Sequence, residues 1–271
     1  MTRAMVIVVT GASGGLGKAC ATYLSSRGHR VYGTSRRAPP EGIESEVGPG
    51  GFRLVKMDIT DTASVDATIK EIIEREGRID ALVNNAGLHV VGPAEILAMD
   101  DFEASLETNC LGAIRVSRAV LPSMRSAGSG RIVNISSVGG LLGLPFQSAY
   151  SAGKFALEGF SESFRAEVRP FGISVCLVEP GDIRHQDCRK ETRNGGPYEE
   201  TFVRVMAKAW KDEERGYPAE KIGPLVERIL RCRNPRARYG FGQFFQKTVP
   251  ILKRFLPSRL VESALRMYYG S

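Results

Sequence analysis

The sequence lacks the features of several protein classes. Its five cysteines are scattered and form no Cys-x-x-Cys pair, which indicates reduced thiols rather than a disulfide framework. The three histidines show no metal-ligand spacing, so we expect no metal site. No apolar run approaches the roughly 20 residues that a membrane-spanning helix needs. No signal-peptide pattern follows Met1 either, and the predicted location is the cytoplasm, with membrane association left open.

Acidic residues are scarce near the C-terminus. The chain has 37 Lys and Arg against 30 Asp and Glu, a net charge of +7. From Val226 onward there are ten basic residues and only two glutamates, a local charge of +8, so the preceding residues are close to neutral. A neutral body with a basic end argues against a broad nucleic-acid surface, and we expect no nucleic-acid partner.

Short runs rich in Val and Ile alternate with helical stretches along the chain. The predicted strands are Val6–Thr10, Arg30–Thr34, Phe52–Met57, Ala81–Asn84, Arg131–Ile135 and Ile173–Glu179, with a short Arg238–Gly240 closing the sheet edge. The clearest helical patterns are Gly17–Arg27, Ser64–Glu76 and Ala149–Phe171. This alternation predicts an α/β fold with a doubly wound parallel sheet, of the Rossmann type, in one domain over residues 1–271.

Two stretches lie outside the alternation. Asp182–Tyr217 is rich in charged residues and is predicted to be a loop followed by a helix that covers the site as a lid. Gln243–Ser271 is a C-terminal extension that is both basic and amphipathic, and we call it the tail.

Three glycines follow the first strand in the pattern Gly-x3-Gly-x-Gly: Gly11, Gly15 and Gly17. Such a turn lets the backbone approach a pyrophosphate at the positive N-terminus of the next helix. Because a strand precedes the glycines and a helix follows them, they favour dinucleotide binding over a simple turn.

The choice of cofactor follows from a missing carboxylate. NAD enzymes usually have an acid at the end of the second strand, where it binds the ribose 2′-hydroxyl. Here no Asp or Glu occurs between Met1 and Pro40, and that strand ends in Thr34-Ser35-Arg36-Arg37. The two guanidinium groups can bind a 2′-phosphate, although they can also be a solvated loop pair. The pattern predicts NADP(H).

Tyr150 and Lys154 are four residues apart, so on a helix their side chains share one face. A neighbouring ammonium favours the phenolate form of a tyrosine, which suits acid–base chemistry near neutral pH. Ser137 follows one predicted strand, and Asn84-Asn85-Ala86-Gly87 ends the strand before it. Because ligands bind at the carboxyl edge of such sheets, we expect these residues to meet in one site.

In order and spacing, these blocks resemble the short-chain dehydrogenase/reductase family over roughly Val6 to Gly181. The matching positions are Thr10–Gly17, Asp58, Asn84–Gly87, Asn109, Ser137, Tyr150, Lys154 and Pro180-Gly181. The resemblance implies an enzyme that interconverts a carbonyl and an alcohol by hydride transfer with a nicotinamide cofactor. It also implies a homodimer or homotetramer built on the helix that carries Tyr150.

The resemblance implies a role for each matching residue. Tyr150 is the general acid/base, Ser137 orients the substrate oxygen, and Lys154 binds the nicotinamide ribose and favours the phenolate. Asn109 supports a proton-relay water from the middle of a helix. The expected cofactor contacts are Gly11, Ser13, Gly15, Leu16, Gly17, Ser35, Arg36, Arg37, Asp58, Ile59, Asn85, Ala86, Gly87, Tyr150, Lys154, Pro180, Gly181 and Ile183. Simpler roles stay open for Asp58, which can cap a turn, and for Asn85, which can brace the sheet.

One position departs from the family's pattern. The family usually has Thr or Ser four positions after Pro180-Gly181, where it contacts the nicotinamide amide, and this chain has His185 there. How the amide is held is therefore left open.

Apolar residues near the expected catalytic groups are either pocket walls or core: Val90, Val91, Leu141, Leu142, Leu144 and Phe146. As pocket walls they predict a bulky, lipophilic substrate. The tail is similar to that of family members that act on steroids, retinoids or long-chain ketones. The alternatives are a membrane-surface scaffold and a non-catalytic NADP-binding sensor, and a sensor is expected to have lost Tyr150, Lys154 or Ser137.

The tail contains two short amphipathic stretches. One is predicted to begin at Pro250. The other is predicted to be capped by Ser258, with four apolar residues on one face: Val261, Ala264, Leu265 and Tyr268. Neither is long enough to be stable alone in water, so their apolar faces must pack on something. The candidates are the chain's own body near the lid, a partner subunit and an anionic membrane surface.

Overall fold

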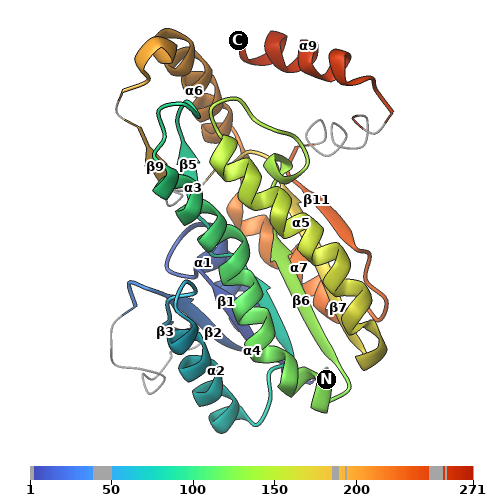
Figure 1. Cartoon of the computed structure of the whole chain (residues 1–271). Coiled ribbons are helices and arrows are strands. Elements are labelled where there is room, and N and C mark those ends of the chain that lie inside the picture. The colour runs from blue at the N-terminus through green and yellow to red at the C-terminus, as the bar shows by residue number, and fades with distance from the viewer. Residues whose placement is uncertain are drawn as a thin grey trace.

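The computed structural model describes residues 3–38, 51–184, 189–192, 194–243, 253 and 255–270. Its centre is a parallel sheet of seven described strands in the order β11–β7–β6–β4–β1–β2–β3 (Figure 1). The strands are β1 (Val6–Thr10), β2 (Arg30–Ser35), β3 (Arg53–Lys56), β4 (Ala81–Asn84), β6 (Gly130–Ile135), β7 (Ile173–Pro180) and β11 (Arg238–Phe241).

Helices cover both faces of the sheet. The helices are α1 (Gly15–Ser26), α2 (Thr62–Glu76), α3 (Met99–Leu106), α4 (Gly112–Ser126), α5 (Ser148–Val168), α6 (Glu199–Glu214), α7 (Ile222–Arg231) and α9 (Ser258–Tyr269). A π-helical turn, Glu107–Leu111, joins α3 to α4. Single 3₁₀ turns span Val138–Gly140, Arg169–Phe171, Gly196–Tyr198 and Ala219–Lys221.

Alternate strand residues build two cores. On one face Ile7 and Val9 of β1 pack with α1 and α7, and on the other Val6 and Val8 pack with α2, α4 and α5. Figure 1 shows α4 and α5 in front of the sheet with α1 and α7 behind it. The strands are buried on both faces, which explains their continuous apolar runs in the sequence.

The predicted doubly wound fold is confirmed, and the predicted strands and helices are present to within a few residues. β11 pairs with β7 at one edge of the sheet, as expected for Arg238–Gly240. Four short strands were not expected, and they pair as β5 (His89–Val91) with β9 (Arg189–Glu191) and β8 (Ile183–Arg184) with β10 (Tyr217–Pro218). These pairs join segments far apart in the sequence, so local periodicity does not indicate them.

The tail forms helix α9 within the described residues. The predicted apolar face is present, but Ser258 is the first helical residue and Pro257 occupies the N-cap position, so the predicted cap is wrong. The stretch expected to begin at Pro250 lies mostly outside the described residues. No helix in the described part of the chain is long and apolar enough to cross a membrane.

Candidate active site

The turn between β1 and α1 depends on glycine. Gly11 and Gly15 have φ angles of +69° and +51°, a region that side chains rarely adopt. A Cβ atom on Gly11 would lie 2.8 Å from the Cα of Ala86, so this turn packs directly against the loop after β4. The N-cap residue of α1, Gly14, offers no side chain to the first N–H groups of the helix. These groups form an anion-binding helix terminus.

Hydroxyl and guanidinium groups gather beside this turn. Ser35, at the end of β2, donates from its Oγ to the Oγ of Ser13 over 3.0 Å, and it accepts from the backbone N–H of Arg37 over 3.1 Å. Arg36 and Arg37 are exposed on the same cavity as Ser13. The carboxyl end of β2 therefore presents two cations and no carboxylate.

Asp58 and Asn85 both make the local contacts expected of a turn cap and of a residue that braces the sheet. The Asp58 carboxylate accepts from the backbone N–H and the hydroxyl of Thr60, at 2.9 and 2.8 Å. The Asn85 Nδ2 donates to the carbonyl of Thr10 over 3.0 Å and braces the glycine turn. Both residues also line the cavity, so a local contact and a cofactor contact are compatible for each.

Helix α5 brings Tyr150 and Lys154 to one face, as their spacing predicts. Lys154 is 4% exposed, and its Nζ donates to the carbonyl of Ile135 over 2.9 Å. The same Nζ lies 5.8 Å from the centre of the Tyr150 ring. Ser137 follows β6, and its Oγ accepts from the backbone N–H of Gly139 over 3.0 Å. The three side chains line one cavity.

Asn109 lies in the π-helical turn between α3 and α4, inside a continuous helical segment as expected. Its Oδ1 accepts from the N–H of Leu88 over 3.1 Å, and its Nδ2 donates to the Leu88 carbonyl over 2.8 Å. The side chain is 1% exposed and does not line the cavity. In this geometry Asn109 holds the loop after β4, beside Gly87.

The cavity has a volume of about 930 Å³ and lies along the carboxyl edge of the sheet. All the expected site residues line it except Gly17 and Asn109. A Cβ on Gly17 would lie 2.4 Å from both the Asn85 Nδ2 and the Gly11 carbonyl oxygen, so Gly17 serves close packing of the turn. The glycine turn and paired cations at one end, with hydroxyl, phenol and ammonium groups further along, fit a dinucleotide. His185 lies outside the described residues.

Sequence reasoning missed an aromatic cluster around Tyr150. The His89 ring lies 4.5 Å from the Tyr150 ring and 5.8 Å from the Trp210 ring, centre to centre. The His89 Nε2 is 2.8 Å from the Oε1 of Gln147, a buried side chain at the start of α5. His89 and Gln147 also line the cavity. The one available signal was the place of His89 in the loop after a strand, at the expected ligand edge.

The structure divides the expected apolar residues between the cavity wall and the core. Leu142 and Leu144 line the cavity, but Val90 and Val91 are fully buried in small cores behind it. Phe146 packs on Phe202 of α6, and Leu141 is likewise not a lining residue. The tail also lines the cavity, in agreement with the prediction that it packs on the chain's own body near the lid, through seven residues: Lys253, Leu256, Val261, Ala264, Leu265, Tyr268 and Tyr269.

Comparison with known proteins agrees with this geometry. The short chain dehydrogenase family model matches residues 5–195. The chain belongs to the short-chain dehydrogenase/reductase family.

Three relatives illustrate the similarity over most of the chain. The 3-ketodihydrosphingosine reductase of Bacteroides thetaiotaomicron is 39% identical, over 98% of each protein. The human 17-beta-hydroxysteroid dehydrogenase type 1 is 40% identical, over 92% of this chain and 80% of that protein. The crystal structure of a short-chain dehydrogenase from Streptomyces avermitilis has a TM-score of 0.81 at 32% identity and covers 97% of both chains. The chain is therefore an oxidoreductase that acts on CH–OH or C=O groups with a nicotinamide cofactor.

Proposed function

We propose that this enzyme interconverts a lipophilic ketone and the corresponding alcohol with NADP(H), using Tyr150 as the general acid/base. The observation that carries the proposal is the shared cavity, which Ser137, Tyr150 and Lys154 line together with the glycine turn and Arg36. The alternative of a non-catalytic sensor has less support, because all three reactive side chains are retained and line the cavity.

The chain's own residues divide the work of the reaction. A nicotinamide in the cavity would donate the hydride in reduction and accept it in oxidation. The Ser137 hydroxyl would orient the substrate oxygen, and the Tyr150 phenol would deliver a proton to that oxygen or remove one from it. Lys154, held by the Ile135 carbonyl, would keep a positive charge near the phenol and bind the cofactor ribose.

The proposal of NADP(H) as the cofactor rests on the residues at the carboxyl end of β2. Arg36 and Arg37 line the cavity beside Ser13 and Ser35, where a 2′-phosphate would need charge-assisted hydrogen bonds. The 2′-hydroxyl of NAD would need an acceptor there, and the sequence has no acid before Glu41.

The proposal of a lipophilic substrate rests on the other residues that line the cavity. The cavity is also lined by Leu142 and Leu144, and by apolar residues of the tail: Leu256, Val261, Ala264 and Leu265. Two relatives are named for 3-ketodihydrosphingosine and for a 17-beta-hydroxysteroid, both of which contain large apolar parts. We propose a long-chain or steroid ketone of this kind, with the reacting oxygen at Ser137 and Tyr150.

A panel of carbonyl compounds tests the proposal. Purified enzyme is mixed with NADPH or NADH and with a long-chain ketosphingoid base, a 17-ketosteroid, retinal or an aldose, and consumption of the reduced cofactor is followed by absorbance. We expect turnover with at least one lipophilic carbonyl, faster with NADPH, and none with the aldose. Turnover restricted to the aldose, or no turnover with any lipophilic carbonyl, would contradict the substrate assignment.

The oligomeric state of the enzyme stays a prediction. The family resemblance implies a homodimer or homotetramer through the helix that carries Tyr150, which is α5 here. Phe155 of α5 is 42% exposed and Leu111 of the neighbouring π-helical turn is 44% exposed, which supports such an interface. Light scattering of the purified protein measures the assembly directly.

A further inference from the structure

Helix α9 lies at one end of the enzyme, against helix α6. Figure 1 shows it at the same end of the molecule as α6, far from α2 and the N-terminus. Two polar contacts tie it to α6: the Tyr268 hydroxyl donates to the Asp212 carboxylate over 2.8 Å, and the Arg204 Nε donates to the Gly270 carbonyl over 3.1 Å. Its inner face closes the cavity with Val261 and Leu265. The helix is therefore a wall between the cavity and the surroundings.

The outer side of this wall is also apolar. No residue of α9 is buried, and Leu260 and Met267 are 56% and 78% exposed. These two residues are seven apart, so they form a stripe along one side of the helix. Phe255, in the turn before the helix, is 81% exposed. The inner face of the helix already lines the cavity. Packing of that face on the chain's own body therefore does not account for the exposed apolar side chains of Phe255, Leu260 and Met267.

Basic residues border the apolar stripe. Arg259 and Arg266 are also seven apart, and on a helical wheel their row lies about 100° from that of Leu260 and Met267. Both are exposed, and Glu262 is the one acidic residue of the helix. An exposed apolar stripe beside a cationic stripe is the pattern of a helix that lies in a membrane interface.

The positive charge of this surface favours a membrane over a second copy of this chain as the partner. A symmetric contact through α9 would bring Arg259 and Arg266 of one copy towards the same arginines of the other. Helix α9 contains two arginines and one glutamate, so two such helices repel one another. An anionic lipid surface attracts the same charges and takes up the apolar side chains.

We propose that α9 and the turn before it dock this enzyme on an anionic membrane surface. Phe255, Leu260 and Met267 enter the boundary between headgroups and acyl chains, while Arg259 and Arg266 bind lipid phosphates. In this orientation the opposite side of the helix faces the cavity, so the cavity lies directly behind the membrane-contacting wall. The docking goes beyond the proposed reaction and does not depend on it.

Vesicle co-sedimentation of the full chain tests the docking. The probes are vesicles of phosphatidylcholine alone and of phosphatidylcholine mixed with phosphatidylglycerol. We expect binding to the anionic vesicles only, and a fall in affinity of at least about tenfold between low and high salt, because the phosphate contacts are screened.

Two double variants separate the apolar and the electrostatic contributions. Leu260→Ser with Met267→Ser, and Arg259→Glu with Arg266→Glu, should each weaken vesicle binding at least about tenfold. The matched controls change exposed residues on other elements and should bind as the wild type: Phe171→Ser for the apolar variant, and Lys70→Glu with Arg75→Glu on α2 for the charge variant. None of the seven side chains in these variants lines the cavity, and thermal melting checks that each variant folds.

Three outcomes overturn the proposal. The first is no sedimentation with anionic vesicles at low salt. The second is equal sedimentation by the wild type and both double variants. The third is a dimer in solution that Leu260→Ser with Met267→Ser abolishes, without vesicle binding by the wild type, which would make this face an interface between copies. A reaction assay that fails while vesicle binding holds would count against the proposed function alone.

Discussion

At the scale of single residues, backbone atoms hold two of the three reactive side chains, Lys154 and Ser137. The Lys154 Nζ is held by the Ile135 carbonyl, and the Ser137 Oγ by the Gly139 N–H. The Asn109 side-chain amide hydrogen-bonds to both the N–H and the carbonyl of Leu88. A backbone contact fixes a side chain with little freedom, so the site is preorganised before a ligand arrives.

Removal of the Tyr150 hydroxyl tests the proposed acid/base. Tyr150→Phe keeps the ring against His89 but takes away the proton donor, so we expect kcat to fall at least about 100-fold. Steady-state rates measure the loss, and a fluorescence titration with NADPH should show nearly unchanged cofactor affinity. A variant that keeps most of its activity would rule out the assigned role.

Arg36 tests the cofactor assignment. Arg36→Ala removes a charge-assisted contact to a 2′-phosphate, which typically contributes about 1.5–3 kcal/mol, so NADPH should bind roughly ten- to a hundredfold more weakly. Binding of NADH, which has no 2′-phosphate, is the internal control and should change little. If both affinities fall equally, or the wild type uses both cofactors equally, Arg36 does not select the cofactor.

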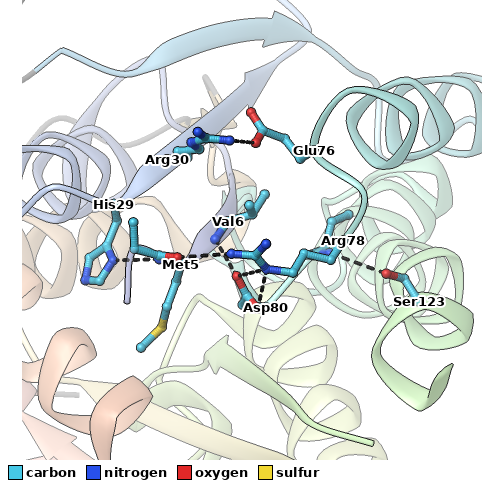
Figure 2. A network of polar contacts seen from close by, with 10 residues as sticks. Met5, Val6, His29, Arg30, Glu76, Arg78, Asp80 and Ser123 are labelled. Atoms are coloured by element: carbon cyan, nitrogen blue, oxygen red, sulfur yellow. Dashed lines mark hydrogen bonds and ion pairs between the residues drawn. The ribbon is translucent and has the colours of Figure 1, made fainter. Parts of the chain in front are cut away.

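At the scale of elements, the start of β1 is held by the segment before β4. The Asp80 carboxylate accepts from the Val6 N–H over 2.7 Å and from the Arg78 guanidinium over 3.0 Å (Figure 2). The Arg78 side chain in turn donates to the carbonyl of Ala4 over 3.2 Å. The Asp80 carboxylate therefore links the start of β1, the strand that leads into the glycine turn, to the segment before β4.

Loss of that carboxylate should destabilise the fold. Asp80→Ala leaves the Val6 N–H and the Arg78 Nε–H without their acceptor, so we expect the free energy of unfolding to fall by about 1–3 kcal/mol. Denaturant unfolding measures the change. Asp66→Ala, on the exposed side of α2, removes an equal charge and should change stability by less than about 0.5 kcal/mol. Equal effects of the two variants would mean that Asp80 acts only through its charge.

Elements also differ in how clearly the sequence indicates them. The strands of the large sheet are short apolar runs bounded by turn residues, and helix α5 is a long periodic pattern; both occur where expected. The pairs β5–β9 and β8–β10 contain two or three residues per strand and exist through partners far along the chain. The same applies to Val90 and Val91, whose burial depends on α3 and α6 packing around them.

At the scale of the whole molecule, a buried histidine makes stability depend on pH. Burial lowers the pKa of His29 from its ordinary value of 6.5, Arg231 lowers it further, and Glu227 opposes the shift. The His29 Nδ1 accepts from the Met5 N–H over 3.2 Å, which requires this nitrogen to carry no proton (Figure 2). The folded protein thus binds fewer protons than the unfolded chain between the lowered pKa and 6.5.

The consequence is a loss of stability in mild acid. The His29 contribution is fully present above the unfolded pKa and is lost as the pH falls through the lowered, folded pKa. Urea unfolding at about pH 7.5 and about pH 5.5 should therefore give a smaller free energy of unfolding at the lower pH. His29→Gln keeps an acceptor for the Met5 N–H but does not titrate, and should reduce this pH dependence. An unchanged dependence in the variant would assign it to other groups.

The sequence by itself determined the fold class, the family and the groups proposed for the reaction. Glycine spacing, a Tyr-x3-Lys pair and the arginines after β2 are local patterns, because a tight turn, one helix face and one strand end each need only neighbouring residues. Tertiary structure alone decided which groups surround the reacting end. His89 and Gln147 approach Tyr150, and α9 closes the cavity more than a hundred residues later in the chain. Such contacts follow from how packed elements meet in space, and no local period in the sequence records them.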